Sequence, residues 1–385
     1  MKILLISSEY SDIRRGGAGV YAFELARNIS RMGIKTTVLT QGGKNLHTEV
    51  TENLSVLEVK TIMLPFLRMP TFLFNSYFAL KKILKNEKFD LIHSNNNAVG
   101  LFKPRVPLIT TIQHPSSVES THQNIVQKIL NHIDVFLERL IVSRSSKIVA
   151  TSKKTQELII KEYPESRHKI HFIPIGVDED IFKPIAFMPY NNILKTKMKI
   201  CFKIFFPGGA RARRKGLETL LQLKEKIDNR IIFFISGTSR ELGWEIRYKK
   251  MLNKSINKEN FVFLGEVSYE RLPLLYSSAD LTIFPSLFEG FGIPSIESLL
   301  CGTPVVCTNT GQAENVIRNG ENGFLIDPIL TSTELYPKIA SLFNDRNLLS
   351  KMKLQTRSSV LGKYDWASLS NRYKKLYGQC LYEHC

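Results

Sequence analysis

The feature that most constrains this chain is an apolar run that leads through a glycine-bearing loop into a short helix. Residues 280–285 indicate a buried strand, and residues 295–300 indicate a helix. Between them, Gly290 and Gly292 carry no Cβ, so the backbone can approach a ligand closely. Pro294 suits the first helical position, because its φ is already set and it has no N–H to lose. A unit of this kind directs N–H groups and the positive end of a helix dipole at an anion.

Two carboxylates flank this loop. Glu289 stands at its start, and Glu297 lies about one turn into the predicted helix, with its side chain leaning back toward the helix start. An ionised carboxylate can accept two hydroxyl groups at once. An anion site beside carboxylates that accept hydrogen bonds from hydroxyl groups fits a ligand that has both a phosphate and a polyol, such as a nucleotide sugar. Taken singly, Glu297 could be a first-turn acid favoured by the dipole and Glu289 a solvated loop charge.

The spacing of the two glutamates resembles the Glu-x7-Glu signature of the retaining glycosyltransferases of family 4, or glycosyl transferases group 1. Members of that family adopt the GT-B fold, in which two doubly wound, Rossmann-like parallel-sheet domains face each other across a cleft. The resemblance implies a retaining transferase that moves a sugar from a nucleotide-diphosphate sugar to a hydroxyl acceptor, in the synthesis of cell-surface glycans or glycolipids.

The rest of the chain alternates strand-like and helix-like segments, which predicts an α/β fold. Residues 2–7 indicate a first strand without a signal-peptide cleavage site. Gly16–Gly19 and a helix over residues 20–32 follow it. In the resembled family this glycine loop faces the donor phosphate, which assigns Gly17 to the donor site. The spacing differs from the dinucleotide G-x-G-x-x-G pattern, so no nicotinamide site is expected. A plain turn is the alternative.

Two further predicted strands, residues 90–93 and 107–112, end in a histidine or lead into one. His114 falls where the family places an active-site histidine near the donor sugar. A hydrogen-bonded structural residue is the alternative for a histidine at a strand end. For His93 we expect a structural or acceptor-side role.

A basic loop over residues 207–216 precedes a helix predicted over residues 217–227 and carries four cations within five residues. Lysine offers a compact charge and arginine a two-pronged donor set, which suits a pyrophosphate. Lys215 and Gly216 match the Lys-Gly of the family. The commoner spacing would put the family's arginine at position 210, where this chain has alanine, so Arg211 and Arg214 compete for that role. The alternative is a solvated basic turn.

The resemblance gives these residues roles. Lys215, with Arg211 or Arg214, would neutralise the leaving diphosphate, and Glu297 would hold the ribose. Glu289 and the amides of the loop after it would hold the donor sugar. The expected catalytic set is His114, Lys215 and Glu289. The expected donor-binding set is Gly17, Arg211, Arg214, Lys215, Gly290, Phe291, Gly292 and Glu297.

The expected domains are an acceptor-side domain over residues 1–180 and a nucleotide-sugar-binding domain over residues 198–365. Residues 169–184 resemble the segment that precedes the hinge in the family. Residues 366–385 are expected to form a helix that returns to the first domain.

Charge and cysteine content limit the partners. The formal net charge of +18 calls for an anionic partner. The cations are scattered and no familiar nucleic-acid motif appears, so phosphates and anionic lipid are expected rather than nucleic acid. Five cysteines without C-x-x-C pairing favour reduced thiols in the cytoplasm. Asp178-Glu-Asp180 resembles a metal motif only superficially, so no metal or other cofactor is expected.

The stretch from residue 62 to 88 predicts contact with an anionic membrane. Its apolar part, residues 62–80, is at the short limit for spanning a bilayer and is interrupted by Pro65, Arg68 and Pro70. After Pro70 an apolar stripe with helical spacing is followed by clustered lysines, a pattern suited to the headgroup plane. The stripe is Leu73, Tyr77, Leu80 and Leu84, widened by Phe74 and Phe78, and the lysines are Lys81, Lys82, Lys85 and Lys88. From this contact we expect a lipid-linked acceptor and a cytoplasmic protein that lies peripherally on the inner face of the membrane. A buried helix with a solvated basic end is the alternative.

Four other functions share parts of this pattern. A GT-B epimerase or a phosphorylase-like enzyme could have the same fold, although the pyridoxal lysine motif that the latter needs is not found. A non-catalytic sugar-nucleotide-binding partner and a basic nucleic-acid binder are the rivals from another class. The presence of Glu289, Glu297 and Lys215 argues against a decayed site.

Overall fold

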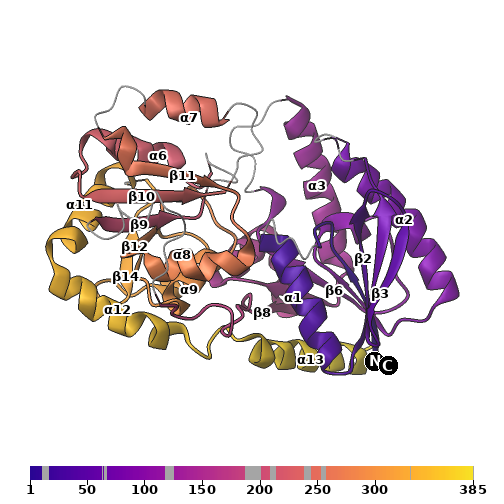
Figure 1. Ribbon diagram of the computed structural model, residues 1–385. Helices are drawn as coiled ribbons and strands as arrows, with labels where there is room; N and C mark the ends of the chain where they lie inside the picture. The colour runs from indigo at the N-terminus through magenta and orange to yellow at the C-terminus, as the bar shows by residue number, and fades with distance from the viewer. Residues whose placement is uncertain are drawn as a thin grey trace. The chain divides into compact units, whose positions relative to one another are not determined.

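The computed structural model describes residues 1–10, 17–62, 64, 67–117, 125–186, 201–208, 214–237, 244–252, 257–329 and 331–384. The chain divides into two compact units (Figure 1). Unit 1 consists of Met1–Gly176 and Trp366–Cys385, and unit 2 consists of Val177–Asp365.

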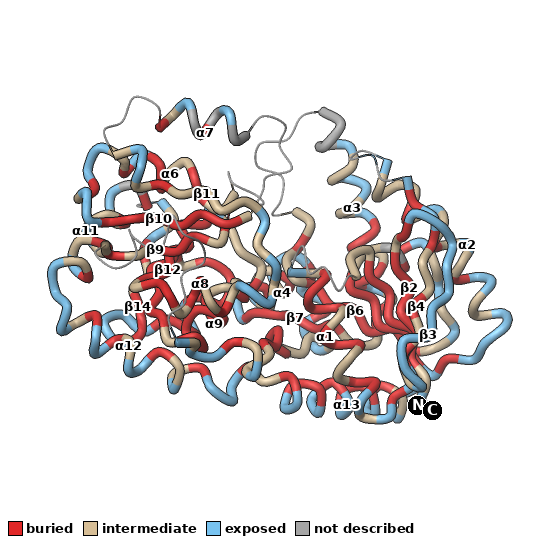
Figure 2. Tube along the Cα trace, in the orientation of Figure 1, coloured by how far each residue is buried: buried red, intermediate tan, exposed pale blue. Residues whose placement is uncertain are grey.

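Unit 1 is built on a sheet whose strands are parallel except for one at the edge. In spatial order the strands are β3 (Leu46–Thr51), β4 (Leu54–Lys60), β2 (Lys35–Gly42), β1 (Lys2–Ile6), β5 (Leu91–Ser94), β6 (Leu108–Ile112), β7 (Lys147–Ala150) and β8 (Ile170–Phe172). The central strands are apolar and buried, as parallel strands covered on both faces require (Figure 2). The antiparallel edge strand β3 was not predicted from the sequence, since its six residues are all exposed and carry no apolar alternation.

Helices cover both faces of this sheet. They are α1 (Gly17–Arg31), α2 (Arg68–Asn86), α3 (Ile125–Arg144), α4 (Lys153–Glu162) and α13 (Trp366–Tyr382). Side chains of α2 and α3 share one hydrophobic core with Leu4 and Ile6 of β1. Helix α13 returns from the end of unit 2 and packs on α1, where the Tyr21 and Tyr373 hydroxyls lie 2.9 Å apart.

The outer face of α2 differs from the predicted stripe. Leu80 is in the core of unit 1, and Leu73 and Leu84 pack against that core. Phe74 and Phe78 point outward, with 65% and 53% of their surface exposed. The prediction that Leu73, Leu80 and Leu84 share an outward apolar face is therefore wrong, because these residues cover the sheet. Among the described residues, no helix is both long enough and apolar enough to cross a membrane.

Unit 2 is a fully parallel sheet in the part of the chain that is described. Its strands, in spatial order, are β11 (Phe261–Gly265), β10 (Ile231–Ser236), β9 (Phe202–Phe206), β12 (Leu281–Phe284), β13 (Val305–Thr308) and β14 (Gly323–Ile326). The helices are α6 (Leu217–Leu221), α7 (Trp244–Leu252), α8 (Leu272–Ser278), α9 (Ile293–Leu300), α10 (Ala313–Val316), α11 (Thr331–Asn344) and α12 (Arg346–Val360).

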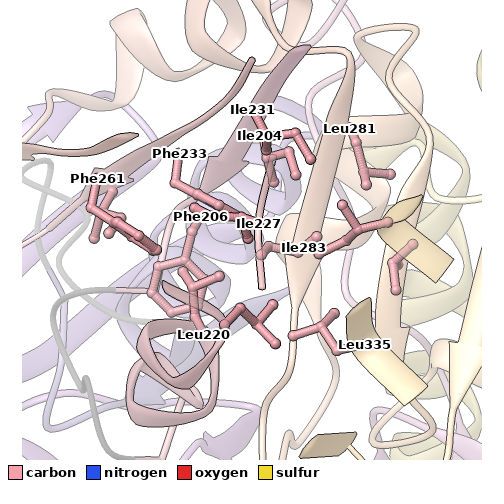
Figure 3. Close-up of a cluster of buried hydrophobic side chains, with 14 of the residues drawn as sticks. Ile204, Phe206, Leu220, Ile227, Ile231, Phe233, Phe261, Leu281, Ile283 and Leu335 are labelled. Carbon is pink, nitrogen blue, oxygen red and sulfur yellow. The ribbon is translucent and has the colours of Figure 1, made fainter. Parts of the chain in front are cut away.

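Alternate side chains of β9 point to the two faces of this sheet. Ile204 and Phe206 belong to one hydrophobic core with Leu220 of α6 and Leu335 of α11 (Figure 3). Phe205 meets Tyr276 of α8 on the opposite face, with ring centroids 5.1 Å apart. The sheet is therefore covered on both faces, and each unit is a doubly wound α/β layer structure, which confirms the predicted fold class.

Two predicted helices have different bounds. The helix predicted over residues 217–227 ends as an α-helix at Leu221 and continues as a short 3₁₀ turn, Gln222–Glu225. Helix α9 begins at Ile293, so Pro294 occupies its second position rather than its first. Proline is tolerated there because the second N–H of a helix also lacks an intrahelical partner.

Candidate active site at the switch point of unit 2

The loops that follow β9 and β12 meet where the strand order of unit 2 changes direction. From β9 the chain builds outward through β10 and β11, whereas from β12 it builds the other way through β13 and β14. Open α/β sheets bind ligands in the crevice beyond the carboxyl ends of strands at such a point. Arg214 to Gly216, the described end of the basic loop, follow β9, and the Glu289 loop follows β12, so the topology places these residues at this crevice.

A left-handed glycine lets these two loops touch. Gly216 has φ +81°, and a Cβ at this position would collide with the carbonyl oxygen of Pro285. Arg214 lies two residues before Gly216, and its carbonyl accepts the backbone N–H of Leu287 at 2.9 Å. Glycine at position 216 is therefore required by the approach of the backbone, and it sets Lys215 beside the end of β12.

The contact brings Lys215 and Glu289 together. The Lys215 Nζ lies 2.6 Å from the Glu289 Oε1, and both side chains are largely buried. Arg214 Nη1 donates to the Phe288 carbonyl at 2.7 Å and lies 3.6 Å from Glu289 Oε2. The Ser286 hydroxyl donates to Glu289 Oε1 at 2.7 Å. One carboxylate thus organises two cations and a hydroxyl at the carboxyl edge of the sheet.

The charge state of Glu289 follows from these neighbours. Burial by itself would raise its pKa, but Lys215 and Arg214, helped by the hydrogen bonds from Lys215 and Ser286, hold the pKa below its usual value. The carboxylate is therefore ionised at neutral pH and can accept hydrogen bonds.

The start of α9 forms the other side of the site. Gly292 is left-handed (φ +92°) and precedes the first helical residue, while the Gln312 N–H donates to the Phe291 carbonyl at 2.8 Å. The Phe291 ring is buried, with its centroid 6.1 Å from that of Tyr364. A small pocket lies here, lined by Phe284, Glu289, Phe291, Gly292, Pro294, Ser295, Cys307, Thr308, Thr310 and Ala313.

Glu297 lies on another side of α9 and does not line this pocket. Only 5% of its surface is exposed, and the Tyr276 hydroxyl donates to its Oε2 at 2.8 Å. Burial, followed by the negative charge of Glu297, raises the pKa of Tyr276 well above its usual value, so the hydroxyl keeps its proton and remains a donor. Glu297 therefore lies against α8, on a side of α9 that does not line the pocket beside Glu289.

The other predicted site residues lie elsewhere or outside the described residues. Gly17 is the first residue of α1, and His114 is half-buried in the turn after β6; both belong to unit 1. Arg211 lies outside the described residues. Of the two competing arginines, Arg214 is thus the one that the structure shows beside Lys215.

His93 is a core residue of unit 1. Its Nδ1 lies 2.8 Å from the Tyr377 hydroxyl, and its Nε2 lies 2.8 Å from the Thr111 hydroxyl. Burial lowers the pKa of His93 to about 3, so the ring is neutral at physiological pH. These contacts favour the structural role over the acceptor-side role.

Sequence reasoning did not single out Ser286 or Tyr276. Ser286 follows directly after the predicted strand 280–285, and this position at the carboxyl edge was a usable signal. Tyr276 lies in the apolar face of a helix, and the sequence pattern of that face is the same whether the tyrosine hydroxyl bonds to Glu297 or to water.

No metal centre is apparent among the described residues, where no group of three or more His, Cys, Asp or Glu side chains could hold an ion. The Asp178 carboxylate of the D-x-D segment instead accepts the N–H groups of Asp180 and Ile181 at 3.1 Å each, which is the geometry of a local turn.

Comparison with known proteins covers both halves of the chain. Residues 202–359 match the family model described as glycosyl transferases group 1, and residues 15–181 match the model described as glycosyltransferase family 4. The chain is 24% identical over 392 residues to an uncharacterized glycosyltransferase of Methanocaldococcus jannaschii, covering 98% of each chain. It is 25% identical over 406 residues to a D-inositol 3-phosphate glycosyltransferase of Corynebacterium jeikeium, covering 98% of this chain and 96% of the other.

Solved structures share the fold. The sucrose-phosphate synthase of Thermosynechococcus elongatus superposes with a TM-score of 0.82 at 20% identity, covering 98% of each chain. An Anabaena protein, HepE, solved in complex with UDP-glucose, superposes with a TM-score of 0.74 at 18% identity, covering 98% of this chain and all of the other. Together with the two matched models, these likenesses identify the chain as a glycosyltransferase of family 4, with the GT-B fold.

Proposed function

We propose that this enzyme is a retaining glycosyltransferase that moves a sugar from a nucleotide-diphosphate donor to a hydroxyl acceptor, in the synthesis of cell-surface glycans or glycolipids. The observation that carries the proposal is the cluster of Lys215, Arg214 and Glu289 at the switch point of unit 2. Two cations beside an ionised carboxylate suit a ligand that is a diphosphate at one end and a polyol at the other.

Lys215 and Arg214 stabilise the leaving group in this proposal. When the bond between the sugar and the diphosphate breaks, negative charge develops on the phosphate oxygens, and fixed cations lower the energy of that state. The Glu289 carboxylate holds the Lys215 ammonium in place before a ligand arrives. An ammonium carries three N–H donors, so Lys215 can hold Glu289 and still bind phosphate oxygens.

Glu289 and the loop from Gly290 to Gly292 hold the donor sugar, and Glu297 holds the ribose. For Glu297 this requires a shift of the Tyr276 hydroxyl or a shared hydrogen bond, since that hydroxyl occupies one carboxylate oxygen. His114 and Gly17 of unit 1 act at the sugar and the phosphate, respectively. These roles and the retention of configuration rest on the resemblance to the family.

The names of similar proteins support a nucleotide-sugar donor without singling out one acceptor. One relative, from Escherichia coli, is a galactosyltransferase that acts from UDP-Gal on a diphosphoundecaprenol-linked sugar, and it is 23% identical over 316 residues. Another is a mannosylfructose-phosphate synthase from Agrobacterium fabrum, 25% identical over 408 residues. The first name includes a lipid-linked acceptor, whereas the second names no lipid.

A donor screen tests the proposal. Thermal unfolding is measured with UDP-, GDP- and ADP-sugars, because a ligand at about 100 times its Kd adds about 2.7 kcal/mol of stability. The donor that stabilises the enzyme is then used in transfer assays that determine the anomeric configuration of the product. We expect one nucleotide class to stabilise the enzyme and the product to retain configuration. An inverted product would overturn the retaining mechanism, and a sugar nucleotide that binds without any transfer would favour a binding partner.

We also propose that α2 contacts an anionic membrane on the cytoplasmic side, which would bring the enzyme to a lipid-linked acceptor. Phe74 and Phe78 are exposed and pack edge to face, with centroids 4.9 Å apart. The side chains of Lys81, Lys82 and Lys85 are exposed on the following turns. Aromatic rings followed by lysines match the apolar and charged layers of a membrane surface.

A further inference from the structure

The turn that carries His114 is held by a buried carboxylate of α3. Glu138 is 2% exposed. Its Oε2 accepts the backbone N–H of Ser116 at 2.8 Å and the Ser116 hydroxyl at 2.6 Å, and its Oε1 accepts the Tyr163 hydroxyl at 2.8 Å. Ser116 is only two residues beyond His114, so these bonds fix the backbone next to the histidine.

The same turn is held from its other side. The Thr155 hydroxyl donates to the Gln113 carbonyl at 2.9 Å, and the Gln113 amide donates to Asn95 at 3.2 Å. Residues on both flanks of His114 are therefore tied to separate elements of unit 1. The histidine itself stands between two fixed points.

Glu138 has no ion pair among the described residues, yet it is buried. Burial raises its pKa, and the bonds from Ser116 and Tyr163 and the charge of His114 oppose that rise. A buried carboxylate is costly unless it is hydrogen-bonded, and here Ser116 and Tyr163 supply those hydrogen bonds. Two of its three hydrogen bonds come from Ser116, two residues beyond His114, which points to a role in holding that turn.

We propose that Glu138 is a positioning residue that acts through His114, by fixing the turn from Gln113 to Ser116 in the geometry that transfer requires. This inference rests on the proposed role of His114 in the reaction. A displacement of a reacting group by about 1 Å can cost about 10²-fold in rate, so a fixed turn has a measurable consequence.

A double-mutant cycle tests the proposal, with Glu138→Ala, Glu138→Gln and His114→Ala as the variants. The glutamine amide can accept from Ser116 and donate to the Tyr163 oxygen, so it preserves the shape without the charge. We expect Glu138→Ala to lower kcat about 10²-fold and Glu138→Gln to restore most of it. In the His114→Ala background, Glu138→Ala should have little further effect, because both changes act on one group. Glu24→Ala, another buried carboxylate of unit 1, controls for loss of stability alone.

A spectroscopic measurement separates this proposal from the proposed function. In enzyme labelled with ¹⁵N in the histidine rings, the His114 signals are assigned by their absence from His114→Ala. We expect Glu138→Ala to shift or broaden them and Glu138→Gln to leave them near their wild-type positions. Unchanged His114 signals in Glu138→Ala would overturn the positioning role, whether or not the enzyme transfers sugar. If the effects of Glu138→Ala and His114→Ala on kcat multiply in the double variant, the positioning role of Glu138 is also overturned, whereas the proposed transferase function is not affected.

Discussion

Lys215 and Glu289 form the pair on which the proposed chemistry depends. They are 74 residues apart in the chain and 2.6 Å apart in space. Glu289 also has Arg214 and Ser286 as neighbours, so the carboxylate keeps partners when Lys215 is removed. Lys215 can therefore be removed by mutation without leaving the buried Glu289 carboxylate unpaired.

We expect Lys215→Ala to lower turnover by about 10²–10³-fold, because one preorganised charge that stabilises the leaving group is lost. The melting temperature should change little, since Arg214 and Ser286 still hold Glu289. Transfer rates and thermal unfolding are measured side by side, with exposed Lys226→Ala as the matched control. Near-wild-type turnover in Lys215→Ala would show that Lys215 does not stabilise the leaving diphosphate.

We expect transfer to survive chelation. Lys215 and Arg214 supply the positive charge that a divalent ion supplies in other transferases. The rate is measured before and after dialysis against EDTA and again after magnesium or manganese is added back. A rate that EDTA abolishes and the ion restores would contradict this expectation and would call for a metal-bound donor.

At the scale of elements, α2 has two distinct faces. Phe72, Ser76 and Leu80 are buried against the sheet of unit 1, whereas Phe74 and Phe78 are exposed. The Lys81 ammonium lies 4.6 Å from the centroid of the Tyr77 ring, so its stem and the aromatic rings occupy neighbouring turns. An amphipathic sequence pattern alone could not separate these faces, because apolar residues occupy both.

We expect the enzyme to sediment with vesicles that contain anionic lipid, and less so as salt increases. The double variant Lys81→Glu/Lys82→Glu should weaken this binding at least about tenfold, given about 1 kcal/mol for each lysine near the surface. Lys153→Glu/Lys154→Glu on α4 makes the same charge change at another exposed site of unit 1. Equal and negligible binding to neutral and anionic vesicles would leave α2 as an ordinary core helix.

At the scale of the whole molecule, the chain ends by returning to unit 1. Tyr373 and Tyr377 of α13 join a buried polar network with Tyr21, His93 and Thr111. Since every member is buried and hydrogen-bonded, loss of one partner leaves another unsatisfied, at a cost of about 1–3 kcal/mol. The network therefore ties the last helix to the first domain through a neutral histidine.

This network predicts a loss of stability in acid. The pKa of His93 is about 3 in the folded enzyme and about 6.5 in an unfolded chain, so below about pH 6.5 the unfolded state binds a proton that the folded state does not. Stability from this group therefore falls as the pH decreases, by up to about 1.4 kcal/mol per pH unit. His93→Gln, which does not titrate, should show a smaller drop in melting temperature between pH 7 and pH 5. His47→Gln, at an exposed histidine of unit 1, is the matched control, and an equal drop in both variants would refute this account.

The sequence by itself determined the buried strands and the chemistry of the loops that follow them. The buried strands carry continuous apolar runs, and Gly216, Gly292 and Pro294 mark the loop and helix starts, because these signals depend on a residue and its near neighbours. The expected fold class followed from the alternation of strand-like and helix-like segments, and the expected family from the resemblance of the Glu289 and Glu297 spacing; both are confirmed.

Only the tertiary structure decided which loops meet. Lys215 reaches Glu289 because β9 and β12 are neighbours in the sheet, and Ser116 reaches Glu138 because α3 packs beside β6. The antiparallel edge strand β3 and the Tyr276 bond to Glu297 arose in the same way. Such contacts depend on the order of strands and on the face that each helix buries, and local periodicity carries no information about either.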